Sequence, residues 1–467
     1  AYMDSVPMVA ITANVTLPLL GKDSFQEVDI AGVTMPITKH GYIVKNVEIL
    51  ADTIRKAFHI ARSGRPGPVL IDITKDVTAA ACEYTPMTIQ PEERVTRYTR
   101  EELMLVAEMI HKAKKPYIYL GGGAIISEAS AEVAEFAELI DAPVCDTLMG
   151  KGAFDGKSER YTGMIGMHGT PVANYATLNT DLIIAIGARF SDRVAGNREE
   201  FGKNAKIIHF DIDASEISKN VHSDMAIVGD AKYILKHMIE RMPETRHKEW
   251  TDTLKDFKTK LGLPKPKEGD AVDPRDLALT LHQIVGEDAI IVTDVGQHQM
   301  IMAQYYQFTR PRSFVSSCGL GTMGFGMGAA IGAKIANPKR PVVLVTGDGS
   351  FHMNMNELAT AVSEKLPIVV LIFNNHVLGM VRQWQTLFYE HRYSNTTIDR
   401  ATDYVKLAEA FGGKGLRIKT RYDIEPVMKE AMHSDTVCVV DCWIDKDDCV
   451  YPIIPPGKGA KDIIIGN

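Results

Sequence analysis

The sequence predicts an α/β protein made of three doubly wound domains, each built around a parallel sheet. Residues 341–375 combine an apolar run, a segment with helical spacing and a second apolar run, which is typical of a strand, a crossover helix and a strand. Short apolar runs at 116–120, 181–186 and 206–210 are each followed by glycine or polar residues, as at the edge of a sheet. The Pro-, Gly- and charge-rich stretch 261–276 indicates a domain boundary.

Length and composition are those of a soluble protein with several cores. A chain of 467 residues is too long for one core. The net charge of −7, without a dense Lys/Arg run, argues against nucleic acid or an anionic membrane as the main partner. No apolar stretch reaches transmembrane length. The six cysteines are scattered, so we interpret them as reduced thiols and expect a cytosolic location.

Residues 1–85 read as the later part of an α/β domain. Strands are predicted at 8–13 and 69–73, and the apolar spacing predicts a helix over 47–61. The first residues already read as a helix end entering a buried strand, so we expect the chain to lack its beginning.

A polar linker over 86–100 leads into a second domain at 100–250. Glycines 121 to 123 follow the strand at 116–120, Gly187-Ala188-Arg189 follows the next, and Asp211-Ile212 follows the third. An acid at a strand end can accept hydrogen bonds from a ribose, and a nearby arginine can pair with a diphosphate. The pattern indicates a nucleotide site, although a glycine triplet is also compatible with a simple turn.

The third domain, 270–467, is predicted to open with a helix over 276–285 and a strand over 289–293. Glycines 319, 321 and 324 form a G-x-G-x-x-G, and Asp348 lies 24 residues after Gly324, near the spacing of a dinucleotide fingerprint. The Asn374-Asn375 pair after the next strand has no role in a dehydrogenase, which weakens that reading.

Asp348 and Asn375 are the central pair of the sequence. Each follows a strand of the strand–helix–strand unit, and parallel strands joined in this way end at one edge of the sheet, where ligands of such sheets bind. A carboxylate and an amide oxygen suit Mg²⁺. The glycines allow close backbone approach, and Ser350 lies at a helix start that favours phosphate. The alternative is a tight turn and an unrelated polar strand end.

These residues carry a resemblance to a known family. Gly347-Asp348-Gly349, followed after 24 residues by Asn374-Asn375, is similar to the signature of thiamine diphosphate (ThDP) enzymes. The stretches 379–385 and 388–393 resemble the catalytic subunit of acetohydroxyacid synthase, also called acetolactate synthase, and the resemblance covers the whole chain. It implies a partial pyrimidine-binding domain, a central Rossmann-like FAD-binding domain, and a diphosphate-binding ThDP domain with a C-terminal lid.

The resemblance also implies roles for individual residues. The residues implied for Mg²⁺ are Asp348, Asn375 and Val377. Those implied for ThDP are Gln297, His298, Gly321, Met323, Asp348, Gly349, Ser350, Asn375 and Val377. Those implied for FAD are Arg65, Gly121, Gly122, Gly123, His168, Gly169, Gly187, Ala188, Arg189, Asp211, Ile212 and Asp230. Those implied for the substrate channel are Phe25, Gln26, Lys75, Arg193, Met380 and Trp384.

Some of these roles have plain structural alternatives. Lys75 is compatible with a solvated strand-end charge, His168 with a cap beside a glycine turn, and Met323 with the core. A large aromatic such as Trp384 can favour a substrate with one extra methylene by about ten to a few hundred fold, or it can be a packed surface residue. The family's cofactor-activating glutamate would fall before Ala1, so no residue is assigned that role.

The resemblance implies decarboxylation of pyruvate and transfer of its two-carbon remainder to pyruvate or 2-oxobutyrate. The products are acetolactate or acetohydroxybutyrate, in the biosynthesis of branched-chain amino acids. The family works as a homodimer or tetramer and often has a small regulatory subunit. The alternatives are a flavin-dependent pyruvate oxidase, another ThDP carboligase or decarboxylase, and a catalytically silent nucleotide-binding chain.

Overall fold

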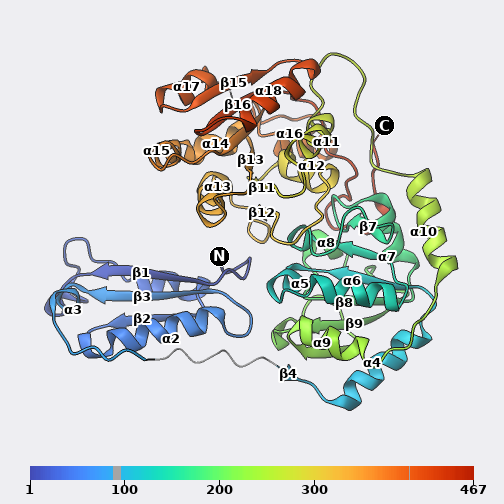
Figure 1. The fold of residues 1–467 in the computed structure, drawn as a ribbon, viewed down its shortest axis with the longest axis horizontal. Helices are drawn as coiled ribbons and strands as arrows, with labels where there is room; N and C mark the ends of the chain where they lie inside the picture. Colours follow the sequence, from blue (N-terminus) through green and yellow to red (C-terminus); the bar gives the residue numbers. More distant parts are fainter. Residues whose placement is uncertain (88–95, 399, 467) are drawn as a thin grey trace. The chain divides into compact units, whose positions relative to one another are not determined.

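The structure is a computed structural model that describes residues 1–87, 96–398 and 400–466 (Figure 1). The chain divides into two compact units, and each is described by itself. The first comprises Ala1–Thr96 with Cys318–Leu320, and the second Arg97–Ser317 with Gly321–Asn467. Most of the predicted linker falls on residues 88–95, which lie outside the described residues.

The first unit contains a three-stranded parallel sheet in the order β1-β3-β2. Its elements are β1 (Met8–Asn14), α1 (Ile30–Thr34), β2 (His40–Val44), α2 (Leu50–Arg62), β3 (Pro68–Thr74) and α3 (Lys75–Ala79). The strands predicted at 8–13 and 69–73 are confirmed. The predicted helix is α2, preceded by a 3₁₀ turn at Val47–Ile49. The described core of this unit forms where α2 packs against the sheet.

The second unit begins with a seven-stranded sheet in the order β4-β10-β9-β8-β5-β6-β7. Its strands are β4 (Thr96–Arg97), β5 (Pro116–Leu120), β6 (Val144–Asp146), β7 (Tyr161–Met164), β8 (Leu182–Ile186), β9 (Lys206–Asp211) and β10 (Met225–Gly229). Its helices are α4 (Arg100–Lys112), α5 (Gly122–Ile126), α6 (Ser130–Leu139), α7 (Pro171–Asn179), α8 (Asp192–Ala195), α9 (Ala231–Ile239) and α10 (Lys248–Lys260). All three strands predicted here are present as β5, β8 and β9.

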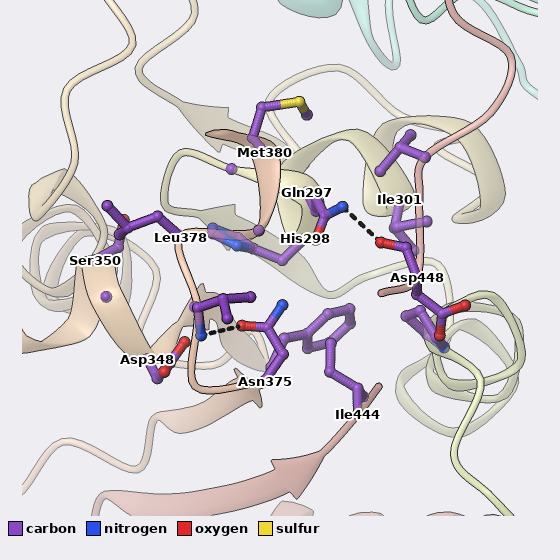
Figure 2. A pocket seen from close by; sticks show the side chains of 18 of the residues that line it. Gln297, His298, Ile301, Asp348, Ser350, Asn375, Leu378, Met380, Ile444 and Asp448 are labelled. Atoms are coloured by element: carbon purple, nitrogen blue, oxygen red, sulfur yellow. Dashed lines mark hydrogen bonds between the residues drawn. The ribbon is translucent and has the colours of Figure 1, made fainter. Parts of the chain in front are cut away.

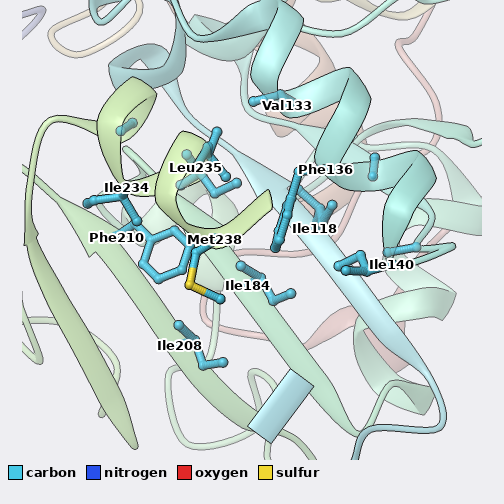
Figure 3. Packing of buried hydrophobic residues seen from close by; sticks show 14 of the residues in the cluster. Ile118, Val133, Phe136, Ile140, Ile184, Ile208, Phe210, Ile234, Leu235 and Met238 are labelled. Carbon is cyan, nitrogen blue, oxygen red and sulfur yellow. The ribbon is translucent and has the colours of Figure 1, made fainter. Parts of the chain in front are cut away.

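Helices cover both faces of this sheet. On one face, α4, α6 and α9 pack their apolar residues on the strands, and Figure 3 shows Phe136, Phe210 and Met238 interlocking there. On the other face, α7 and α10 supply Val172 and Trp250. Burial of such side chains stabilises the fold by about 1.5–3 kcal/mol each. The central domain is therefore doubly wound.

The third sheet has six parallel strands in the order β12-β11-β13-β14-β16-β15. Its strands are β11 (Ile290–Thr293), β12 (Phe314–Ser316), β13 (Val342–Gly347), β14 (Val369–Asn374), β15 (Lys414–Ile418) and β16 (Cys438–Trp443). Its helices are α11 (Pro274–Val285), α12 (Gln297–Tyr305), α13 (Phe325–Ala336), α14 (Asp348–Asn354), α15 (Leu358–Ser363), α16 (Gly379–Phe388), α17 (Tyr404–Ala410) and α18 (Ile424–Met432).

Alternate residues of these strands enter two different cores. Val343 and Val345 pack with α11, α12 and α18, whereas Leu344 packs with α13, α15 and α17 on the opposite face. The third domain is therefore also doubly wound. The α/β fold class with three parallel sheets is confirmed, and the domain limits 1–85, 100–250 and 270–467 stay predictions.

The register of β13 and β14 positions the candidate site. Gly347 pairs with Phe373, so the two strands end together. Helix α14 starts at Asp348, directly after β13, with Gly347 as its N-cap. In the described ranges, no helix has the length and apolarity needed to cross a membrane.

Candidate cofactor and substrate site

A cavity lies at the carboxyl edge of the third sheet, where β11, β13 and β14 end (Figure 2). The start of α12 and the start of α14 form part of its wall, and the segments 377–381 and 444–450 form another part. The sequence-predicted residues that line it are Gln297, His298, Met323, Asp348, Gly349, Ser350, Asn375, Val377 and Met380. Gly321, which was also predicted, is not among its lining residues.

Asp348 and Asn375 line this cavity together, which confirms that the two strand ends converge. Both residues are buried, with exposed fractions of 2% and 8%. The Asn375 side-chain oxygen accepts a hydrogen bond from the backbone N–H of Val377, at 3.2 Å. That bond turns the chain so that Val377 lies beside the same cavity.

Burial raises the pKa of the Asp348 carboxyl to about 6. The nearby His376 ring and backbone N–H groups of Gly349 and His376 oppose this effect and keep the rise limited. The carboxylate therefore ionises near neutral pH at a considerable cost, which a bound cation would offset.

His298 is buried beneath the loops that end β11 and β13. A carbon atom added at Gly296 would lie 2.9 Å from its ring and would clash with it, and one added at Gly347 would crowd the ring at 3.2 Å. Burial lowers the pKa of His298 to about 3, although a hydrogen bond with the backbone of Asp294 has the opposite effect. Its Nε2 atom is buried and has no hydrogen-bond partner. A neutral ring nitrogen without a partner, on the cavity wall, is suited to an incoming ligand.

We expect the His298 ring not to titrate at the pH of an ordinary histidine, about 6.5. Because its pKa is lowered on folding, its contribution to stability is complete above about pH 6.5 and is lost as the pH falls through the folded value. The test is a pH titration of the histidine ring resonances by NMR, with His298→Asn to assign the signal. A midpoint near the ordinary value would contradict the buried, neutral state.

The Gln297 amide bonds to other protein groups, although the family resemblance implied a contact with the ThDP diphosphate. Its Nε2 donates to the Gln383 side-chain oxygen at 3.0 Å. It also donates to the Asp448 carbonyl at 2.7 Å (Figure 2). Its oxygen lies against Gly379, where an added carbon atom would be 2.1 Å away. To donate to a diphosphate, Gln297 would have to release one of these two protein acceptors.

Gly349 and Ser350 are accounted for by close packing at the start of α14. A carbon atom added at Gly349 would lie 2.8 Å from Leu378 and 3.0 Å from Ile398, so glycine lets these segments approach. The Ser350 hydroxyl donates to the Val295 carbonyl at 3.2 Å. Met323 lines the cavity close to Gly349.

These observations fit a Mg²⁺ ion that carries a diphosphate. The cavity offers a carboxylate that is costly to ionise, an amide, and a buried ring nitrogen without a partner. Among the described residues, no group of three His, Cys, Asp or Glu side chains could hold a metal. A magnesium site would therefore use one carboxylate with amide and carbonyl oxygens, which are ligands that Mg²⁺ accepts.

Two of the predicted substrate-channel residues meet outside this cavity. The Arg193 guanidinium of α8 lies 5.9 Å from the centre of the Trp384 ring on α16, a cation–π distance. Trp384 does not line the cavity, but Met380, one helical turn before it, does. Phe25, Gln26 and Lys75 belong to the first unit, and their roles stay predictions.

Most of the residues predicted for FAD lie at the carboxyl ends of β5, β8, β9 and β10. Gly121 and Gly123 are explained by packing, since added carbon atoms would lie 2.1 Å and 2.6 Å from the Gly187 backbone. Their N–H groups donate to Ile186 and Gly187 carbonyls at 3.0 Å. Asp230 caps α9. The close glycine packing is sufficient to explain the triplet, so it does not by itself indicate a ligand.

The remaining predicted FAD residues lie in three different settings. His168, in the loop 166–169 that also contains Gly169, bonds through Nδ1 to the Pro452 carbonyl at 3.2 Å, so this loop contacts the C-terminal segment. Arg65 bonds to the Ser5 hydroxyl at 2.9 Å within the first unit. Gly122, Ala188, Arg189 and Ile212 flank the sheet edge described above.

Comparisons with known proteins agree with this geometry. Residues 294–442 match the model of the thiamine pyrophosphate enzyme C-terminal TPP-binding domain, and residues 103–238 match the thiamine pyrophosphate enzyme central domain. The acetolactate synthase large subunit of Porphyra purpurea is 42% identical over 99% of this chain and 80% of its own length. The chain belongs to the acetolactate synthase large-subunit family.

Other members of the family support the assignment. The probable acetolactate synthase large subunit of Methanocaldococcus jannaschii is 43% identical, over 99% of this chain and 81% of its own length. That of Haemophilus influenzae is 40% identical, over 100% of this chain and 83% of its own length. Similarity of this extent covers both the central domain and the domain that contains Asp348 and Asn375.

Sequence reasoning missed several residues of this acetolactate synthase family site. Asp448 and Cys449 line the cavity, although no motif marks them, whereas Val450, which also lines it, begins the C-terminal segment that resembles the family's lid. Gln383 lies behind the cavity wall and bonds to Gln297 and Val450. The only signal available was that Gln383 is polar and lies beside Trp384 in the stretch that resembles the family.

Proposed function

We propose that this chain catalyses the acetolactate synthase reaction. Pyruvate loses CO₂, and the two-carbon remainder joins a second 2-keto acid, either pyruvate or 2-oxobutyrate. The products are acetolactate or acetohydroxybutyrate, for the biosynthesis of valine, leucine and isoleucine. The observation that carries the proposal is the convergence of Asp348 and Asn375 on one cavity in a chain of this family.

In this proposal the Asp348 carboxylate, the Asn375 amide oxygen and the Val377 carbonyl would hold Mg²⁺, which would supply positive charge for binding the ThDP diphosphate. Bound ThDP supplies the carbon nucleophile and electron sink that decarboxylation requires. The residues of the chain bind, orient and exclude water. The step that activates the cofactor is assigned to no residue of this chain.

The burial of Asp348 and His298 gives each a distinct task. Asp348, with its raised pKa, gives up its proton when the metal binds, so metal affinity depends on pH near the pKa of about 6. His298, with its lowered pKa, stays neutral and adds no positive charge to the cavity wall.

We assign substrate choice to Trp384 and Arg193. The ring and the guanidinium lie together, and the segment that carries Trp384 also carries Met380, which lines the cavity. The guanidinium is suited to the carboxylate of the second 2-keto acid, and the ring to its alkyl chain. A substrate-channel role for Phe25, Gln26 and Lys75, which belong to the first unit, stays a prediction.

We propose FAD as a further cofactor of the central domain, at the carboxyl edge of β5, β8, β9 and β10. The support is the family membership together with Asp211, whose carboxylate lies at the end of β9. Asp211→Ala should lower the flavin content of the purified protein by about tenfold, since a hydrogen bond to a charged group is lost. The measurement is the absorption of flavin released by denaturation.

A matched control is Asp213→Ala, two residues further along, where the carboxylate caps a short 3₁₀ turn at Ala214–Glu216. This variant should retain flavin. Equal flavin loss in both variants, or none in Asp211→Ala, would contradict the assignment of Asp211 to FAD.

Family membership also supports a homodimer or tetramer and a small regulatory subunit as partners. The name "large subunit" of the relatives implies such a partner. The cytosolic location stays a prediction.

The test of the function supplies the purified protein with ThDP, Mg²⁺, FAD and pyruvate. Acetolactate should form with CO₂ release, and acetohydroxybutyrate should appear when 2-oxobutyrate is added. Oxygen consumption without acetolactate would favour the pyruvate oxidase. Cofactor binding without any product would favour the catalytically silent nucleotide-binding protein, and either result would overturn the proposal.

A further inference from the structure

Helix α16 is anchored by a buried amide. Gln383 is the only buried residue of this helix, and its exposed fraction is 1%. The residues on either side of it, Arg382 and Trp384, are only partly buried. A polar side chain in this position is retained only where its hydrogen bonds are satisfied.

Gln383 connects three parts of the cavity wall. Its side-chain oxygen accepts from Gln297 Nε2 at 3.0 Å and from the Val450 backbone N–H at 2.7 Å. Its Nε2 donates to the Val450 carbonyl at 3.0 Å. One amide therefore joins α16 to the start of α12 and to the segment 444–450.

These bonds fix the orientation of both amides. A rotated Gln383 amide would direct its N–H groups at the N–H groups of Gln297 and Val450. Gln297, in turn, directs its Nε2 at two acceptors and keeps its oxygen beside Gly379, at the start of α16. An added carbon atom at Gly379 would also lie 2.9 Å from the Asn375 amide nitrogen. The position of α16 is thus coupled to the proposed metal ligand.

The same anchor sets the position of Trp384, the next residue of the helix, whose ring lies 5.9 Å from the Arg193 guanidinium. The Arg382 side chain ties the helix to Asp447 with hydrogen bonds of 2.8 Å and 2.6 Å, but this contact is exposed. Gln383 is therefore the buried connection between the cofactor side and the substrate side of the site.

We propose that Gln383 is a positioning residue that sets both cofactor affinity and the choice of the second 2-keto acid. It acts through Gln297 and the start of α16 on the cofactor side, and through Trp384 on the substrate side. This inference rests on the proposed function.

The test compares Gln383→Met with the wild type. Methionine keeps the volume but loses the three hydrogen bonds. The dissociation constant of ThDP, measured by calorimetry with Mg²⁺, should rise at least about tenfold, since Gln297 and α16 lose their fixed position. The ratio of acetohydroxybutyrate to acetolactate from a fixed substrate mixture should shift at least about threefold.

Gln299→Met is the matched control. Gln299 is buried on α12, its Nε2 donates to the Ser316 hydroxyl at 2.7 Å, and it does not line the cavity. The control should lower Tm, as Gln383→Met does, but leave the dissociation constant and the product ratio unchanged. If Gln383→Met changes Tm alone, or if the control moves both quantities equally, Gln383 has only a structural role and the inference is wrong.

Gln383→Glu provides a second variant should Gln383→Met not fold. It keeps an oxygen that accepts from Gln297 and Val450, but it replaces the N–H donor to the Val450 carbonyl with a second oxygen and adds a buried negative charge. The ThDP dissociation constant should again rise, and the product ratio should shift in the same direction as in Gln383→Met, each by at least about twofold to threefold. If neither quantity changes, the inference is wrong. If the wild type itself binds no ThDP, the proposed function fails. If the wild type binds ThDP only as tightly as both variants do, this inference alone fails.

Discussion

Replacement of Asp348 by asparagine should lower Mg²⁺- and ThDP-dependent acetolactate formation by more than about a hundredfold. Loss of residues that merely orient metal ligands costs about 10–100-fold, so loss of a direct carboxylate ligand should exceed that. Asparagine keeps the size of the side chain and removes its charge. Activity at saturating Mg²⁺ and ThDP is the measurement.

The same substitution should make the metal-free protein more stable near neutral pH. Because the pKa of Asp348 is raised to about 6 in the folded state, its stabilising contribution is complete below its ordinary pKa of 3.8 and is lost as the pH rises through the folded value. The free-energy cost of ionising the buried carboxyl, which the substitution removes, is about 3 kcal/mol at pH 7. Tm without Mg²⁺ should therefore be higher in Asp348→Asn than in the wild type, and Mg²⁺ affinity of the wild type should increase as the pH rises past 6.

Asp441→Asn is the control for this prediction. Asp441 is a buried carboxylate on β16, next to β14, and it accepts hydrogen bonds from Asn374, Arg417 and Trp443. Its replacement should lower Tm but keep Mg²⁺ binding. Asp348→Asn with activity within about tenfold of the wild type would show that Asp348 is not a direct metal ligand.

Replacement of Trp384 by leucine should lower the ratio of acetohydroxybutyrate to acetolactate by about tenfold or more. Contact with one extra methylene is worth about 1–3 kcal/mol of discrimination, and the ring contributes that contact in the proposed channel. The variant also removes the ring beside the Arg193 guanidinium. The measurement is the product ratio from a fixed mixture of pyruvate and 2-oxobutyrate, with activity on pyruvate alone as reference.

Trp443→Leu is the matched control. Trp443 is the last residue of β16, is 43% exposed and lies outside the cavity lining. Its replacement should leave the product ratio unchanged. An unchanged ratio in Trp384→Leu, or an equal change in both variants, would contradict the assignment of substrate choice to Trp384.

The strand ends of the site could be predicted because local patterns determine them. The β-branched runs of β13 and β14 mark buried parallel strands, and the topology rule for such strands brings Asp348 and Asn375 to one edge. Strand β2, with His40-Gly41-Tyr42, carries no clear alternation and was not predicted. Strand β16 was also missed, since its run 438–443 was considered only for its cysteines.

The contact between Gln383 and the cavity wall could not be predicted. Gln383 and Val450 are 67 residues apart and meet only through tertiary packing, so neither spacing nor composition indicates their contact. For the glycine triplet 121–123, a clear local pattern was present but its interpretation differs from what the structure shows. Its pattern suggested a close ligand, whereas the structure explains two of its members by the backbone of Gly187.

The most direct measurement is a crystal structure of the protein with ThDP and Mn²⁺ in place of Mg²⁺, with anomalous scattering to locate the metal. We expect one metal peak at coordination distance from the Asp348 carboxylate, the Asn375 amide oxygen and the Val377 carbonyl, next to the bound diphosphate. A diphosphate bound elsewhere, or a metal without contact to Asp348 and Asn375, would contradict it.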